Sequence, residues 1–244
     1  MSVEPLLSTH ALEKSFGGIR AVAKVDFSLQ PGELRCLIGP NGAGKSTFFK
    51  MLTGQMRPSA GEIRMFGKPS QSLESHQIAD QGVGIKNQIP DVMNGLSVRE
   101  NIWLSASRRV AVSKADQMVA EIADRLCLGD VLDKQVGTLA HGQRQWTEIA
   151  MVMVARPRLI LLDEPVAGMS DEETHATAEL LRELNTDTTI IVVEHDMAFI
   201  RAIARKVTVF HQGSILIEDA FEVVMRDQRV RDVYLGRKAG EKHV

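Results

Sequence analysis

The chain has 244 residues, of which 44% are hydrophobic and 25% are charged, and its formal net charge is -2. With a mean hydropathy of -0.07, these values exclude a membrane-embedded, disordered or small disulfide-stapled protein, and they provide no global attraction for nucleic acid. The longest apolar run, Ile149 to Ala155, is far shorter than the roughly 20 residues that cross a bilayer. Cys36 and Cys127 lie in apolar segments, so we expect both to be core residues and not a disulfide framework. We expect residues 1–244 to form one domain that is not exported.

The first part of the chain is predicted to form antiparallel β structure. Ala21 to Leu29 alternates apolar and polar residues, residues 30–33 form the turn sequence Gln-Pro-Gly-Glu, and Leu34 to Ile38 continues as a strand. Glu62 to Phe66 is a further short strand bounded by glycines. Alternation of this kind, broken by Pro and Gly, is typical of paired strands joined by tight turns.

The segment that follows Ile38 matches the P-loop pattern of Gly, four residues, Gly, Lys and then Ser or Thr. Glycines let successive backbone N–H groups converge on phosphate oxygens, and the next helix directs its positive end to the same point. Lys45 would bridge the β and γ phosphates and Ser46 would ligate Mg²⁺. The alternative, an ordinary glycine-rich turn, is disfavoured by the preceding strand and the helical pattern of Thr47 to Leu52. The ATP-binding residues predicted here are Gly39, Pro40, Asn41, Gly42, Ala43, Gly44, Lys45, Ser46 and Thr47.

A helical subdomain is predicted over about residues 90–150. Ser97 and Glu100 have the spacing of a capping box, and apolar residues then recur at helical intervals as far as Leu128. A glutamine, Gln88, follows the sequence Gly82-Val83-Gly84, which by itself is most simply a loop.

The second half of the chain has the pattern of a parallel α/β sheet. Two short apolar runs, Leu159 to Leu162 and Thr189 to Val193, flank a helical stretch from Asp171 to Leu184. Asp163 and Glu164 directly follow the first run, where ligands bind at the carboxyl ends of parallel strands. We assign Asp163 to Mg²⁺ and Glu164 to the general base, against the alternative of a structural cap. Residues 226–244 are predicted to be a solvated tail or a final helix.

A further motif, Leu-Ala-His-Gly-Gln-Arg-Gln-Trp over residues 139–146, resembles the signature of the ATP-binding cassette family, which is usually Leu-Ser-Gly-Gly-Gln. The resemblance extends to Gln88, which matches the glutamine that senses Mg²⁺ and water near the γ-phosphate, and to His195, which matches the histidine that contacts that phosphate. Phe16 falls where the family stacks an aromatic ring on adenine. Each match is weak alone, since Phe16 or His195 could be a core or surface residue, so their order along the chain carries the resemblance.

The resemblance implies an ATPase with the P-loop NTPase fold of this family, including an antiparallel β subdomain and a helical subdomain that carries the signature. Two cassettes stack head to tail, and the signature of one acts on the ATP held by the P-loop of the other. The implied cofactors are ATP and Mg²⁺. The implied catalytic residues are Glu164, His195 and Gln88, the metal ligands are Ser46, Gln88 and Asp163, and the signature residues are Leu139, Ala140, His141, Gly142 and Gln143.

Several positions depart from the family pattern. Ala140 replaces the signature serine, which removes a hydroxyl that bonds the γ-phosphate, and His141 replaces the first signature glycine. We expect slower hydrolysis at the composite site that uses this signature. Ser170 stands where many members have an aspartate, and with Glu173 it has capping-box spacing. Nothing in the sequence explains Asn87, which replaces an aromatic residue.

Local strings, including residues 139–146, 163–174, 193–197 and 233–237, resemble the urea-type ATP-binding subunit of the branched-chain amino acid uptake group. Trp146 could instead have only a packing role and not mark this subunit type, because Trp146, Ile149, Ala150 and Met153 share one helix face. The resemblance implies a peripheral subunit at the cytoplasmic face of the inner membrane, with a second, different cassette, two membrane permease subunits and, indirectly, a periplasmic solute-binding protein as partners. The alternatives are a branched-chain amino acid transporter subunit, a soluble non-transport cassette ATPase and a weakly hydrolytic ATP-clamping module.

Overall fold

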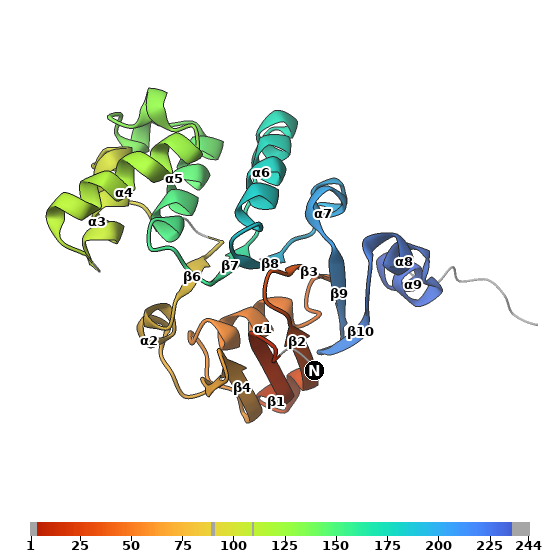
Figure 1. Cartoon of the computed structure of the whole chain (residues 1–244). Coiled ribbons are helices and arrows are strands. Elements are labelled where there is room, and N and C mark those ends of the chain that lie inside the picture. The colour runs from red at the N-terminus through yellow and green to blue at the C-terminus, as the bar shows by residue number, and fades with distance from the viewer. Residues whose placement is uncertain (1–3, 89–90, 109, 236–244) are drawn as a thin grey trace, which may run out of the picture. The chain divides into compact units, whose positions relative to one another are not determined.

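The computed structural model describes residues 4–88, 91–108 and 110–235. It divides into two compact units, shown in Figure 1: the first unit comprises Met1–Ser75 and Val192–Val244, and the second comprises His76–Ile191. The helical subdomain expected near residues 90–150 falls within the second unit. No helix among the described residues is both long and apolar enough to cross a membrane.

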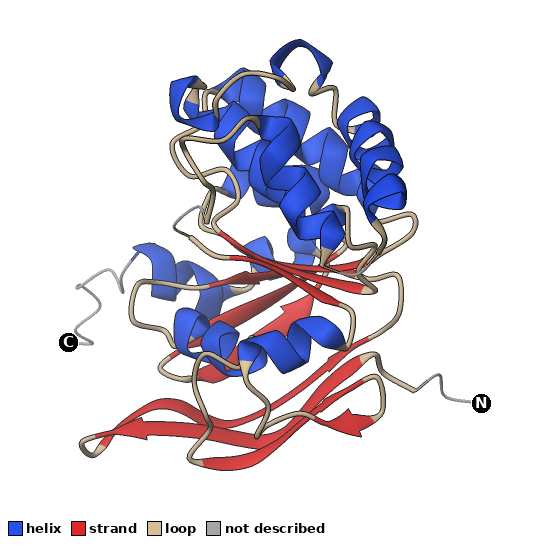
Figure 2. Ribbon diagram, turned by 90° about the vertical axis from the view of Figure 1, so that its left-hand side faces the viewer, coloured by secondary structure: helices blue, strands red, loops and turns tan. Residues whose placement is uncertain are grey.

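An antiparallel sheet forms the N-terminal part of the first unit, and its long strands lie at the bottom of Figure 2. β1 pairs antiparallel with β2, and Leu7 lies opposite Leu29, which confirms antiparallel β structure at the start of the chain. The strand Leu34–Ile38, expected to continue this structure after the turn at residues 30–33, instead belongs to the other sheet. Val25, Phe27 and Leu29 are buried alternately, whereas the positive φ of Lys24 (48°) interrupts the alternation nearer the start of β2. The strand order is β2-β1-β4-β5, with bounds β1 (Leu7–Phe16), β2 (Ile19–Leu29), β4 (Ala60–Met65) and β5 (Lys68–Pro69).

The same unit contains a second group of strands. β3 (Leu34–Ile38) is buried throughout and pairs parallel with β9 (Lys206–His211), which pairs antiparallel with β10 (Ser214–Asp219). The predicted turn before β3 is confirmed by a hydrogen bond from Glu33 N to Gln30 O. Phe48 of α1 (Lys45–Leu52) packs its ring against Phe27, at 5.5 Å between centroids, and against a β9 ring at 5.1 Å. Helix α1 is therefore anchored to strands of the same unit.

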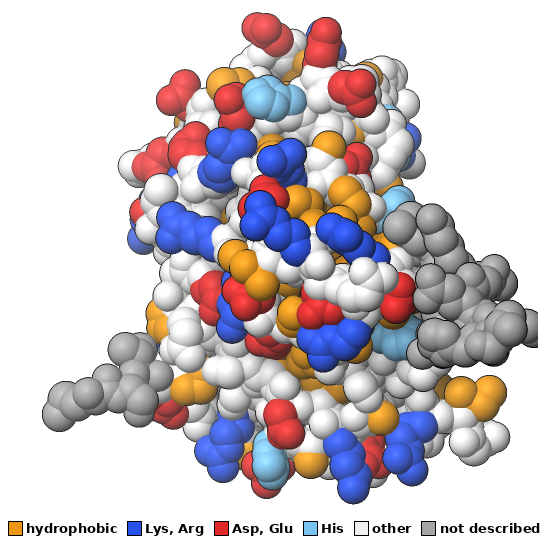
Figure 3. Space-filling view, turned by 90° about the vertical axis from the view of Figure 1, so that its right-hand side faces the viewer, with side chains coloured by type: hydrophobic (Ala, Val, Ile, Leu, Met, Phe, Trp, Pro, Cys, Tyr) orange, Lys and Arg blue, Asp and Glu red, His pale blue; other side chains and the backbone are white. Residues whose placement is uncertain are grey.

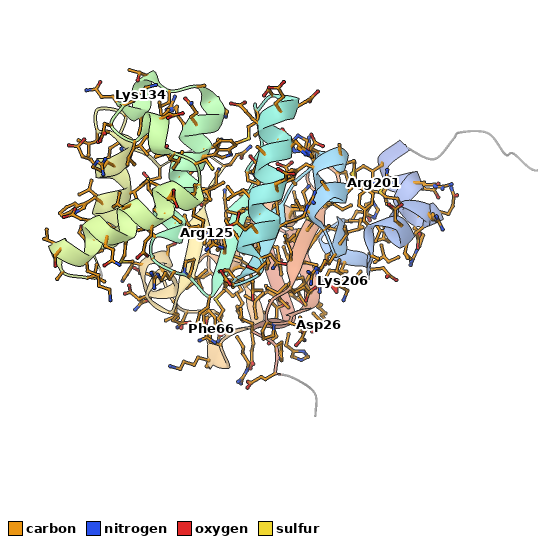
Figure 4. The ribbon with its side chains drawn as sticks, turned by 45° about the horizontal axis from the view of Figure 1, so that its top comes forward. Asp26, Phe66, Arg125, Lys134, Arg201 and Lys206 are labelled. Carbon is orange, nitrogen blue, oxygen red and sulfur yellow. The ribbon has the colours of Figure 1, made fainter. Side chains whose placement is uncertain are left out.

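The last helices of the first unit are α7 (Met197–Ile203), α8 (Phe221–Arg226) and α9 (Gln228–Leu235). Arg201 on α7, labelled in Figure 4, pairs with Glu222 on α8 at 3.1 Å. Of the two alternatives predicted for residues 226–244, α9 is the final helix and not a solvated tail, because Val230 is only 1% exposed and burial raises the pKa of Tyr234 to about 12. The remainder of that prediction, residues 236–244, lies outside the described residues.

The second unit combines parallel strands with a group of packed helices. β6 (Val83–Lys86) pairs parallel with β7 (Leu159–Asp163), which confirms the parallel α/β prediction, and Gln88 lies on the loop after β6. Helices α3 (Val98–Ser107), α4 (Val112–Arg125) and α5 (His141–Met153) pack together. The other elements are α2 (Ser75–Asp80), two short 3-10 helices (Gly129–Val131 and Val136–Thr138), α6 (Asp171–Leu184) and β8 (Thr189–Val193), the last of which crosses from the second unit into the first.

Local signals in the second unit have mixed outcomes. The Ser97 and Glu100 capping box is confirmed, because Glu100 N donates to Ser97 Oγ and Ser97 N donates to Glu100 Oε2. The predicted helical stretch from Ser97 to Leu128 is interrupted between α3 and α4. Arg125, labelled in Figure 4, forms ion pairs with Glu183 and Asp187 at 3.1 and 3.2 Å.

The two cysteines differ in exposure. Cys36 is fully buried in β3, as predicted, and burial raises the pKa of its thiol. The prediction that Cys127 is a core residue is wrong: Cys127 is exposed, and its φ of 51° places it in the left-handed region just after α4. The left-handed backbone there breaks the helical pattern of buried positions, so Cys127 is exposed while Leu126 and Leu128 beside it are buried. On the face shown in Figure 3, Lys and Arg side chains lie among Asp and Glu side chains and hydrophobic patches.

Candidate functional site

The P-loop of the first unit connects β3 to α1. Gly44 is the N-cap of α1, and no side chain of this residue caps the first turn of the helix. The Lys45 ammonium donates to Gly39 O at 2.6 Å and to Pro40 O at 3.1 Å, which places it beside the same backbone. Uncapped N–H groups, a positive helix end and a lysine fit a phosphate anion.

Two glycines of this loop are required by close backbone packing. Gly39 has φ 146°, and a Cβ there would lie 2.3 Å from Phe210 O. Gly44 has φ 103°, and a Cβ there would lie 2.4 Å from Ala21 O. The loop is therefore seated directly on strands β2 and β9, with no room for a side chain at either position.

Phe16 lies at the end of β1, next to the turn that leads into β2. It pairs with Ile19, and two residues later Ala21 reaches the P-loop at Gly44. The Phe16 side chain is 46% exposed, with Lys14 Nζ 5.3 Å from its ring centroid. This exposed ring is the aromatic surface that the resemblance assigns to adenine.

His195 follows β8 and is exposed, and its position is set by the residue before it. Glu194 is only 1% exposed, and its Oε2 accepts hydrogen bonds from His195 N at 2.7 Å and Asp196 N at 3.2 Å. Asp196 caps α7 by accepting from Phe199 N. Sequence reasoning missed Glu194, although an acid directly after the apolar run Thr189 to Val193 is a signal for a buried carboxylate with a fixed task.

The acidic residues lie in the second unit at the carboxyl end of β7. Asp163 is the last residue of that strand, and Glu164 has φ 47°, which is uncommon for a side chain that is not glycine. Gln88, on the loop after β6, donates from Nε2 to Glu164 Oε2 at 2.7 Å. The structure therefore brings two of the predicted catalytic residues into direct contact, and backbone strain of this kind clusters at functional sites.

The signature residues begin helix α5. Ala140 is the N-cap without a side-chain cap, and its N–H donates to Gln143 Oε1 at 3.3 Å. A Cβ on Gly142 would lie 2.3 Å from Glu173 Oε1, so any larger residue there would displace the Glu173 carboxylate. His141 Nε2 lies 2.8 Å from Ala167 O, which joins the signature to the loop after Glu164.

Two structural interpretations of nearby residues have support. Ser170 Oγ accepts from Glu173 N and Glu173 Oε2 accepts from Ser170 N, so the capping box predicted for α6 is confirmed. Trp146 Nε1 donates to Thr177 Oγ1 at 2.8 Å, and Ile149, Ala150 and Met153 on the same helix are buried. Trp146 therefore has the packing role that was its alternative.

Magnesium would need ligands besides protein side chains. Within residues 4–88, 91–108 and 110–235, no three His, Cys, Asp or Glu side chains form a group that could hold a metal ion. Mg²⁺ is usually held by one or two carboxylates together with phosphate oxygens and water, so the residues present fit a nucleotide-bound ion. The candidate protein ligands remain Ser46, Gln88 and Asp163.

Comparison with known proteins identifies the family. A family model described as ABC transporter matches residues 22–167. The high-affinity branched-chain amino acid transport ATP-binding protein LivG of Escherichia coli K12 is 35% identical over 96% of this chain and 98% of LivG. Its counterpart BraF of Pseudomonas aeruginosa is 32% identical over 95% of this chain and 98% of BraF.

A solved structure gives the same result at the level of the fold. The ADP conformation of an ATP-binding cassette from an ABC transporter has a TM-score of 0.85 and 25% identity, covering 95% of this chain and 99% of that chain. The predicted fold class, a P-loop NTPase with antiparallel and helical portions, is confirmed. The chain belongs to the ABC transporter family and is an ATP-binding ATPase subunit of it.

Proposed function

We propose that this chain hydrolyses ATP to drive an importer for branched-chain amino acids. The observation that carries the proposal is the 2.7 Å hydrogen bond between Gln88 and Glu164. It holds a carboxylate at the end of a buried strand with its orientation fixed, as a general base requires. An ATP-clamping module that hydrolyses weakly would have no need for this contact.

The residues of the chain divide the chemical work. The P-loop N–H groups and Lys45 bind the phosphates, and Phe16 stacks on adenine. Glu164 takes the proton of the attacking water, and Gln88 orients that carboxylate, while His195 contacts the γ-phosphate. Ser46 of the first unit and Asp163 and Gln88 of the second are the residues that would hold Mg²⁺, which would supply positive charge to offset the charge developing on the phosphates.

The signature acts on a second cassette. The N-terminus of α5 has no side-chain cap at Ala140, so its N–H groups are suited to an anion, and Gly142 keeps the backbone accessible. We assign Leu139, Ala140, His141, Gly142 and Gln143 to the ATP held by the partner cassette in a head-to-tail dimer. The changed signature favours a heterodimer, in which the other composite site has the usual serine.

Docking to the membrane subunits uses a groove of the second unit. The groove has a volume of about 320 Å³ and lies between β6, α3 and α5, with Val83, Ile85, Met93, Leu104, Met151 and Val152 among its lining residues. Met93 and Leu104 are exposed apolar side chains there. A short cytoplasmic helix of one of the two permease subunits would fit such a groove, which supports a position of this chain at the cytoplasmic face of the inner membrane. A periplasmic solute-binding protein would deliver the solute.

The solute is proposed from the relatives. LivG and BraF match nearly the whole chain and are both named for branched-chain amino acid transport. They favour branched-chain amino acids over urea as the solute. The support for urea is the resemblance of the signature and of three other short segments to the urea-type subunit. Reconstitution with the permease subunits and the binding protein discriminates between them: leucine, and not urea, should stimulate hydrolysis.

Single-turnover hydrolysis tests the chemical part of the proposal. The Glu164→Gln variant should bind ATP with unchanged affinity and release no phosphate on the timescale of the wild type. Phosphate release at the wild-type rate by this variant would remove Glu164 from the role of general base.

A further inference from the structure

A single carboxylate on α5 holds both ends of the loop that carries Gln88. Glu148 Oε2 lies 3.2 Å from Lys86 Nζ, and Lys86 is the last residue of β6. Glu148 Oε1 accepts a hydrogen bond from Asp91 N at 3.1 Å, beyond Gln88. Residues 89 and 90 between them lie outside the described part of the chain.

The ion pair is buried. The Lys86 side chain is 0% exposed and that of Glu148 is 5% exposed. Burial raises the pKa of Glu148, and the charge of Lys86 opposes that rise. Because desolvation offsets most of the attraction within such a pair, apolar residues of similar size would stabilise this position equally well. Stability alone therefore does not account for the pair.

The downstream end of the loop has a second buried anchor. Asn101 on α3 is 0% exposed, accepts from Met93 N at 2.8 Å and donates to Met93 O at 3.1 Å. The backbone is thus held by hydrogen bonds at Asp91 and Met93 on one side of Gln88, and the chain on the other side is held by the ion pair of the Lys86 side chain. Within this frame, the Gln88 amide reaches Glu164.

Glu148 also connects this loop to two further features. It lies on α5, about two helical turns after His141, so it moves with the signature helix. Glu148 and Asp91 are both lining residues of the groove between β6, α3 and α5. A group that enters this groove therefore meets the carboxylate that holds the loop.

We propose that Glu148, paired with Lys86, is a positioning residue that sets the placement of Gln88 on Glu164. This inference rests on the proposed ATPase function. It adds that the Glu148–Lys86 pair connects the groove and the signature helix to Gln88, and through Gln88 to the general base. Loss of the carboxylate frees both ends of the loop, so Gln88 no longer holds Glu164 in one orientation.

The test separates positioning from stability by replacing the whole pair. The double variant Lys86→Met with Glu148→Leu keeps the volume and removes both charges, so it is expected to fold with a thermal midpoint within about 4 °C of the wild type. Its kcat for ATP, measured on the complex with the partner subunits, should fall at least about tenfold, because a small misplacement of a catalytic group is costly. Its KM for ATP should not change.

Two further variants complete the design. Glu148→Gln keeps an oxygen for Asp91 N and loses the charge, so its kcat should lie between those of the wild type and the double variant. Asp133→Asn is the control, because Asp133 pairs with Arg99 at 2.8 Å on the same unit but is 79% exposed. It should leave thermal midpoint and kcat unchanged.

The outcomes distinguish this inference from the proposed function. A wild-type kcat in the double variant would overturn the positioning role, and so would a fall of kcat that parallels a fall of the thermal midpoint in both Glu148 variants. Absence of hydrolysis in the wild-type complex would overturn the proposed function and this inference together. Low kcat with retained thermal midpoint and KM would support the inference.

Discussion

The side-chain amide of Gln88 donates a hydrogen bond to the carboxylate of Glu164 at 2.7 Å. The two residues are 76 positions apart in the sequence, and parallel pairing of β6 with β7 brings the ends of their strands together. In the proposed mechanism Glu164 is the general base, and its amide partner and strained backbone would hold it ready for proton transfer before the substrate arrives. The ATPase activity of the family therefore has an explanation in particular contacts of this chain.

Removal of the Gln88 amide should slow the chemical step. We expect Gln88→Ala to lower kcat by roughly 10- to 100-fold, because Glu164 loses the partner that orients it. ATP affinity should be retained, since the P-loop is untouched. Gln117→Ala is a matched control, because Gln117 donates to Glu121 at 2.8 Å in a Gln–Glu pair on the exposed face of α4. Equal kcat values for Gln88→Ala and the wild type would contradict the assigned role.

The Lys45 ammonium should account for much of the affinity for ATP. Lys45→Ala removes charge-assisted hydrogen bonds to phosphate, so binding should weaken by roughly 10- to 100-fold or more. Isothermal titration calorimetry with ATP measures this loss directly. Lys50→Ala, an exposed position in the last turn of the same helix, should bind ATP normally. Unchanged affinity in Lys45→Ala would refute the phosphate assignment.

The alanine in the signature should limit hydrolysis at the site it completes. Ala140 is the N-cap of α5 and has no side-chain hydrogen bond. Ala140→Ser should restore one hydrogen bond to the phosphate and speed hydrolysis by about tenfold. The rate should be measured in the dimer with the partner cassette, because the proposed function assigns the signature to the partner's nucleotide. An unchanged rate would show that the site already compensates for the missing hydroxyl.

The two cysteines should react very differently with a thiol reagent. Cys36 is buried in β3 and burial raises the pKa of its thiol, whereas Cys127 is exposed after α4. One thiol per chain should therefore react in the folded protein and two in denaturant. Mass spectrometry should place the first label on Cys127. Rapid labelling of Cys36 in the folded protein would contradict the described packing of β3.

Much of this arrangement could be predicted from the sequence because its signals are local. The P-loop and the capping boxes at Ser97 and Ser170 depend on residues a few positions apart, and the structure confirms both boxes. The parallel strands around α6 were predictable from two apolar runs. The resemblance to the ABC family, based on ordered motifs, is confirmed by the comparisons.

The features that sequence reasoning missed depend on contacts between distant residues. The pairing of β3 with β9 joins segments at opposite ends of the chain, and periodicity does not specify such partners. In the sequence, Lys86 and Glu148 look like ordinary surface charges. Only the packing of α5 against β6 shows that they form a buried ion pair. Cys127 was misplaced because the left-handed turn after α4 cannot be read from its apolar neighbours.

The most direct test of the account is ATP-dependent leucine uptake into proteoliposomes that contain the membrane subunits, the partner cassette and this chain, with the solute-binding protein outside. The wild type should accumulate leucine with concurrent phosphate release, and Glu164→Gln should do neither at an appreciable rate while still binding ATP. Leucine uptake at the wild-type rate with Glu164→Gln, or uptake of urea and not leucine by the wild type, would contradict the account.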